Sequence, residues 1–149
     1  MRAFFSIGIL AAMVAGCDST EPGPRLPEEL AGTWRAEAAC AECTFTLTSV
    51  ANPEQSFDLL DPPSSVTAVL TLTRSGSATL DLMGSHVSGM ARVSGSQLIL
   101  TALASADTMD YAVTGSNLTL DFHGTFELVD FTGDGLADPA TGHAVLRKQ

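Results

Sequence analysis

Asn117-Leu118-Thr119-Leu120-Asp121-Phe122 alternates polar and apolar side chains without a break. Successive side chains of a β-strand point to opposite faces, so Leu118, Leu120 and Phe122 share one face and the polar residues share the other. The same period of two recurs at 66–73. No window of a dozen residues carries the apolar stripe of a helix. The pattern therefore predicts an all-β protein.

Turn residues interrupt the alternating runs at close intervals, as in Arg74-Ser75-Gly76-Ser77 and Ser94-Gly95-Ser96. Short Gly- and Ser-rich connections are typical of antiparallel hairpins. The longest irregular stretch, residues 51–65, contains three prolines and is expected to be a loop or flap. We expect about eight to ten antiparallel strands in an up-and-down β-barrel, because closing a sheet removes its edges. The expected strands are 32–38, 43–50, 66–73, 77–84, 87–93, 97–103, 108–113, 117–122, 125–130 and 142–148.

The N-terminal segment has the layout of a secretory signal. Arg2 supplies a positive start, and residues 3–15 are almost entirely apolar but shorter than the about 20 residues of a membrane-spanning helix. The run ends in Val14-Ala15-Gly16-Cys17, which resembles the lipobox of bacterial lipoproteins. The resemblance implies removal of residues 1–16 and attachment of a diacylglycerol to Cys17. The alternative is an ordinary signal peptide with an accidental cysteine.

Residues 17–29 are predicted to be a lipid anchor and tether, followed by one barrel domain over 30–149. The segment is rich in proline and acidic residues, and Leu26 is its one large apolar side chain. We therefore expect a semi-extended tether that contributes nothing to a core. This organisation predicts a location at the bacterial cell envelope, with the outer membrane favoured over the inner one.

The charge balance limits the partners. Seven basic and 17 acidic side chains give a net charge of −10, and cleavage after residue 16 would remove Arg2 and no acid. Nucleic acid and anionic surfaces reward clustered Lys and Arg, so nucleic acid is excluded as a partner. The expected partners are the membrane, through the lipid, and a small apolar ligand or an envelope protein.

A Gly-x-Trp motif, Gly32-Thr33-Trp34, lies at the start of the first expected strand, and Arg147 lies on the last one. Together they resemble the lipocalins and bacterial lipocalin-like proteins. The resemblance implies that Trp34 plugs the bottom of the barrel and that Arg147 packs across its ring. A guanidinium over an indole contributes about 0.5–2 kcal/mol and would tie the first strand to the last. A plain core tryptophan is the alternative for Trp34.

Residues 130–138 (DFTGDGLAD) form an acidic loop that resembles calcium-binding loops. Calcium takes six to eight oxygen ligands, which alternate positions of a loop turned at glycine can supply. The expected ligands are the carboxylates of Asp130, Asp134 and Asp138, an oxygen of Thr132 and the carbonyl of Leu136. The predicted cofactor is one structural calcium ion, and the alternative is a solvated turn without metal.

The sequence contains three cysteines. If Cys17 carries the lipid, the two that remain are Cys40 and Cys43, in the segment Cys40-Ala41-Glu42-Cys43. A redox pair needs a thioredoxin-like βαβ context, and a zinc site needs two further ligands; the sequence shows neither. A local disulfide between Cys40 and Cys43 that staples a hairpin is the interpretation this composition favours.

No nucleophile–base constellation, His-Glu-x-x-His or phosphate-binding glycine loop occurs, so we expect a protein that is not an enzyme. The leading hypothesis is a binding module whose barrel holds a small apolar molecule. The alternative is a protein-interaction or inhibitor module with a solid barrel, acting through loops such as 51–65. The first hypothesis predicts a cavity lined by Leu70, Leu72, Leu82, Leu98, Leu100 and Phe126.

Overall fold

The computed structural model describes residues 25–62, 64–102 and 105–149. The lipobox, Cys17 and residues 18–24 of the tether lie outside these ranges, so the anchor stays a prediction. The described part contains strands and no helix, and hence no helix able to cross a membrane.

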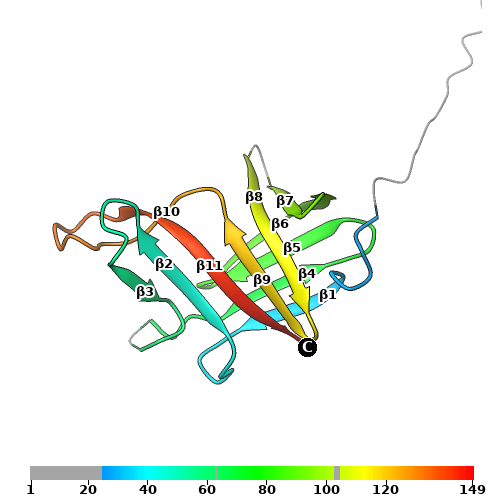
Figure 1. Ribbon diagram of the computed structural model, residues 1–149, viewed down its shortest axis with the longest axis horizontal. Coiled ribbons are helices and arrows are strands. Elements are labelled where there is room, and N and C mark those ends of the chain that lie inside the picture. The colour runs from blue at the N-terminus through cyan, green and yellow to red at the C-terminus, as the bar shows by residue number, and fades with distance from the viewer. Residues whose placement is uncertain (1–24, 63, 103–104) are drawn as a thin grey trace, which may run out of the picture.

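Eight antiparallel strands form a closed barrel, in the order β1-β4-β5-β6-β7-β8-β9-β11 and back to β1 (Figure 1). Strands β4 to β9 follow one another as an up-and-down meander. The prediction of a closed antiparallel barrel is confirmed, and the architecture is consistent with a lipocalin-like barrel. The strands are β1 (Gly32–Ala36), β2 (Thr44–Ser49), β3 (Ser56–Asp58), β4 (Ala68–Leu72), β5 (Ser77–Leu82), β6 (Ser85–Ser94), β7 (Gln97–Ala102), β8 (Ser105–Thr114), β9 (Asn117–Phe122), β10 (Phe126–Val129) and β11 (Asp138–Lys148).

The long strand β11 is the seam of the barrel. Along one edge it pairs with β9 and then β10, and along the other with β1 and then β2. Strands β1 and β2 are both antiparallel to β11, so they follow one another along the same edge. They are therefore not a hairpin.

A disulfide joins Cys40 to Cys43, as predicted, with Cα atoms 5.3 Å apart. The predicted hairpin around it is wrong, because β1 pairs with β4 and β11 instead of β2. The disulfide closes the loop between β1 and β2, the two strands that share one edge of β11. Cys43 Sγ lies 3.5 Å from the carbonyl oxygen of Arg35, so the end of this loop lies close to its start.

The segment 51–65 is more ordered than the predicted loop or flap. It contains β3, which pairs with β2, and Leu59 and Leu60 are buried in the core. The three-residue β3 escaped detection because such a short run carries too little alternation. Asp58 helps to fix the segment, since one carboxylate oxygen accepts the amides of Phe45 and Leu60.

The tether prediction is wrong at Leu26, which is 2 % exposed and belongs to the core. Its amide donates to the carbonyl of Arg74 at 3.1 Å, which docks the chain against the β4–β5 turn. The packed domain therefore begins before residue 30. A single leucine among prolines and acids gave no periodic signal.

The barrel closes where β1 meets β11, around Trp34, Gly32 and Lys148. Trp34 is fully buried, and its indole N–H donates to the carbonyl of Leu30 at 2.8 Å. Lys148 Nζ lies 5.0 Å from the centroid of the indole ring and donates to the carbonyl of Glu29. Gly32 has a φ of +141°, and a Cβ there would lie 2.8 Å from Lys148 Cε. The glycine of the Gly-x-Trp motif thus leaves room for the lysine stem.

The expectation that Arg147 packs across Trp34 is wrong. Arg147 is exposed and lies opposite Arg35, whereas Lys148 lies opposite Trp34. Neighbouring residues of a strand face opposite sides, so a shift of one position moves the cation from the outer face to the indole. The predicted link between first and last strands is present, with lysine as its cation.

Replacing Lys148 by Met should lower the free energy of unfolding by about 0.5–2 kcal/mol, because the variant keeps the apolar stem and loses the cation over Trp34. Urea denaturation followed by tryptophan fluorescence measures the change. Arg147→Met is the matched control and should not destabilise the protein. Equal losses in both variants would contradict this assignment of the cation.

Candidate functional site

The interior of the barrel contains an apolar cavity of about 50 Å³. It lies between the two walls of the barrel, and every side chain that lines it is apolar. A cavity lined only by apolar side chains favours apolar guests, because water there would lack hydrogen-bond partners. The lining residues are Phe45, Ala68, Leu70, Leu80, Leu82, Leu100, Met109, Leu120, Phe122, Phe126, Ala144 and Leu146.

Four of the six residues predicted to line a cavity do so: Leu70, Leu82, Leu100 and Phe126. The prediction is wrong for Leu72 and Leu98, which are at most 1 % exposed and packed in the core. Both lie further toward the Trp34 end of their strands, where side chains fill the barrel. Alternation identified the inner face correctly, but it carries no information about depth along the barrel.

Three aromatic rings form one wall of the cavity. Phe45 and Phe122 are stacked with centroids 6.1 Å apart, and Phe126 meets Phe122 edge-on at 5.0 Å. Gly142 on β11 makes room for them, since a Cβ there would lie 2.7 Å from the Phe126 ring. The one local signal for this cluster is the glycine within an alternating strand, because such a glycine often marks a close approach.

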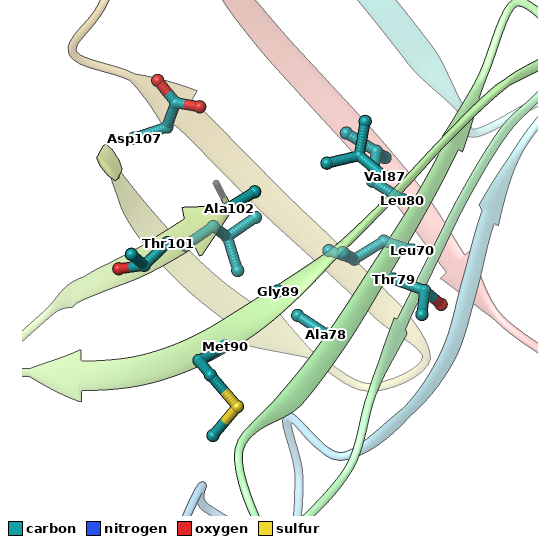
Figure 2. Close-up of a pocket in the computed structure, with 11 residues that line it drawn as sticks. Leu70, Ala78, Thr79, Leu80, Val87, Gly89, Met90, Thr101, Ala102 and Asp107 are labelled. Carbon is teal, nitrogen blue, oxygen red and sulfur yellow. The ribbon is translucent and has the colours of Figure 1, made fainter. Parts of the chain in front are cut away.

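A second pocket, of about 60 Å³, opens through the wall beside the interior cavity (Figure 2). It shares Leu70, Leu80 and Leu100 with the cavity. The described pairing of β6 with β7 covers Met90–Ser94, and Gly89 still lies against β7, where a Cβ would come within 2.1 Å of the Thr101 carbonyl oxygen. Because they share three leucines, the cavity and the side pocket are neighbours.

The side pocket is lined mainly by apolar residues, together with two threonines and one charged residue. Val87 is on the inner face, opposite Leu80, yet is 41 % exposed, and Met90 is 56 % exposed. Asp107 on β8 lies opposite Leu100 and is the one charged residue that lines the pocket. In Figure 2 Asp107 and Val87 lie on opposite sides of the opening. The site thus combines an apolar interior with a carboxylate at its edge.

The acidic loop joins β10 to β11, the last two strands, as predicted, but its carboxylates mostly bind its own backbone. Asp130 accepts the amides of Gly133 and Gly135 at 2.6 and 2.8 Å. One oxygen of Asp138 accepts the amides of Phe131 and Thr132. The hydrogen bonds that Asp130 accepts, first of all the one from the Gly135 amide, lower the pKa of this carboxyl group from its usual 3.8.

These ligand positions do not fit a calcium cage as they lie. Asp134 accepts the amide of Leu136, whose side chain is 70 % exposed. Within the described ranges no three His, Cys, Asp or Glu side chains converge as metal ligands. Binding would require the free lone pairs of Asp130, Asp134 and Asp138 to turn toward one point. Calcium binding stays a prediction.

Each histidine forms a hydrogen bond with an aspartate on the outer surface. His86 lies 2.6 Å from Asp81, His123 lies 2.8 Å from Asp110, and His143 lies 2.6 Å from Asp121. Both members of every pair are well exposed, so each pair contributes little to stability. None of the histidines lines the apolar cavity.

Comparison of the chain with protein-family models, curated proteins and solved structures gives no match.

Lowering the pH should release the acidic loop. A carboxylate whose pKa is depressed in the folded state contributes stability above its unfolded pKa, and that stability is lost as the pH falls through the folded value. The amide resonances of Gly133 and Gly135 should therefore titrate together with a midpoint below 3.8. Asp130→Ala should abolish this titration. Persistence of the titration in that variant would show that another group controls the loop.

Calcium can be tested with the same two amides. If the predicted ligand set forms, millimolar calcium should shift both resonances in the wild type, and Asp134→Ala should remove the shift because it deletes one carboxylate ligand. Magnesium at equal concentration is the control for ionic strength. Identical spectra with and without calcium would establish a loop held by hydrogen bonds alone.

Proposed function

We propose that this chain is a non-enzymatic lipoprotein of the bacterial cell envelope, anchored through Cys17, whose barrel binds a small apolar ligand. The observation that carries the proposal is the interior cavity, which is lined only by apolar side chains and adjoins a second apolar pocket through the barrel wall. A barrel filled to core density would leave no such space.

The size of the cavity limits the ligand. A cavity of roughly 150 Å³ in another protein accommodates benzene, and the interior cavity here has about 50 Å³. The guest must therefore be slender, such as the end of an alkyl chain. A longer chain would pass the three shared leucines into the side pocket, where its polar end would meet water near Asp107.

The polar end of this ligand is expected to be neutral or cationic. Asp107 is exposed at the rim, and the whole chain carries a net charge of −10. A carboxylate or sulfate head group in this opening would be repelled by both. An alcohol or an amine would donate a hydrogen bond to Asp107 instead.

The alternative is a protein-interaction module acting through the segment 51–65. Its support is that β3 is the end strand in the sheet order, because a strand with a free edge can pair with an extended peptide. Leu59 and Leu60 anchor this segment in the core, so it would present a fixed edge instead of a flexible flap.

Filling the cavity tests the ligand proposal. Leu100→Phe enlarges a side chain shared by both pockets and should weaken binding of decanol roughly tenfold or more. Ile99→Phe, on the opposite face of the same strand, is the matched control and should leave the affinity within about twofold. NMR titration of the leucine methyl resonances reports the site directly.

Two results would overturn the proposal. One is that decanol shifts no interior methyl resonance of the wild-type protein at any soluble concentration. The other is that both phenylalanine variants weaken binding equally, which would place the ligand outside the barrel. Pairing of an added peptide with β3, without decanol binding, would favour the alternative.

A further inference from the structure

A polar groove of about 390 Å³ lies at the Trp34 end of the barrel, where β1, the end of β11 and the disulfide loop meet. In Figure 1 this is the region around the C label. Arg35, Arg147 and Lys148 line it together with Glu37 and Gln149. The groove shares no lining residue with the two apolar pockets.

This concentration of positive charge is unusual for so acidic a chain. The sequence contains seven Lys and Arg residues against 17 acids, and three of the seven line this groove. Arg35 and Arg147 lie directly opposite each other on β1 and β11. Like charges at directly opposed positions of a sheet are destabilising. An anion lying between the two guanidinium groups would reduce this repulsion.

The three cations differ in how far they are neutralised. Arg35 contacts Glu37 through Nε at 2.9 Å and Nη2 at 2.7 Å, both to the same oxygen. Lys148 is held by the Glu29 carbonyl and the Trp34 ring, neither of which carries a formal charge. Among the described residues, no carboxylate lies within 4.0 Å of Arg147.

We propose that this groove binds a phosphate group, held between the guanidinium groups of Arg35 and Arg147 with Lys148 nearby. Arg35 is already paired with Glu37, whereas no carboxylate of the described residues lies within 4.0 Å of Arg147, so a phosphate would supply the anion that this pair of opposed guanidinium groups lacks. Guanidinium groups bind phosphate through paired N–H donors, and a tetrahedral phosphate can accept from both arginines at once.

The bound group belongs to a small molecule or to a lipid head group. The overall charge of −10 opposes the approach of an extended anionic surface, whereas a single phosphate experiences mainly the local field of the groove. The site stands independently of the apolar ligand, because the two sites share no residue.

NMR titration of the purified full-length chain tests this site. Inorganic phosphate should produce saturable shifts in the amide resonances of Arg35 and Arg147. Sodium chloride at matched ionic strength should not reproduce them. Arg147→Gln should weaken phosphate binding roughly tenfold or more, because it removes the guanidinium without an acidic partner. Arg92→Gln removes the same charge from an exposed position on β6 and should leave the affinity within about twofold.

Thermal denaturation gives an independent readout. Without phosphate, Arg147→Gln should raise the melting temperature by about 2 °C, because the opposed positive charges are relieved. A role of Arg147 in stability alone would lower it.

Absence of saturable shifts in the wild type, or equal weakening in the Arg147 and Arg92 variants, would overturn the proposal. Glycerophosphoglycerol, the head group of phosphatidylglycerol, distinguishes the two sources of the phosphate. Saturation by it supports the site with a lipid head group as ligand. Saturation by inorganic phosphate alone supports the site with a free phosphate monoester as ligand.

Discussion

Barrel closure depends on the contact between Trp34 and Lys148. The two residues are directly opposed on β1 and β11, whose described pairing, Trp34 with Lys148 and Arg35 with Arg147, joins the first barrel strand to the last. The indole fills the end of the barrel, and the ammonium group lies over its ring where Gly32 provides space. Without this closure β1 and β11 would be open edges, and edges of this kind favour aggregation.

The length of β11 also explains why β2 pairs with the same strand as β1. Strand β11 is 11 residues long, more than twice the length of β1, so much of its edge extends beyond β1. Strand β2 pairs with that extra length, and the loop closed by Cys40 and Cys43 brings the chain back to the same edge. The disulfide therefore fixes the spacing between two segments that lie in line. A short disulfide loop has a small entropic effect, so its main role here is geometric.

Sequence reasoning predicted the fold well because the signals involved are local. Alternation located most strands to within a few residues, and β9 matched the predicted range 117–122 at both ends. The sequence pattern did not predict which strands and residues pair with one another. The choice of Lys148 over Arg147 depends on a register between residues 114 positions apart, and the position of Leu26 depends on the distant Arg74. Neither is encoded in a local pattern.

The same limit applies to the sites. Four cavity residues were predicted because the inner face follows from alternation, whereas the side pocket beside Val87 depends on how residues of β4 to β8 lie together. The cationic groove was entirely unforeseen, since Arg35 and Arg147 are far apart in the sequence and single basic residues in an acidic chain attract no notice.

The barrel has chemically different sites, and their separation follows from its construction. At the Trp34 end, large side chains fill the interior, so polar chemistry is confined to the outer groove, where water and anions can reach arginine. Further along the strands the side chains leave an apolar cavity, and the exposed Asp107 lines the pocket beside it. Opposite charges at the two sites favour different molecules, because Asp107 repels the phosphate that the groove attracts. On the two proposals made above, a phosphorylated small molecule would be directed to the groove, and an uncharged or cationic alkyl compound to the interior.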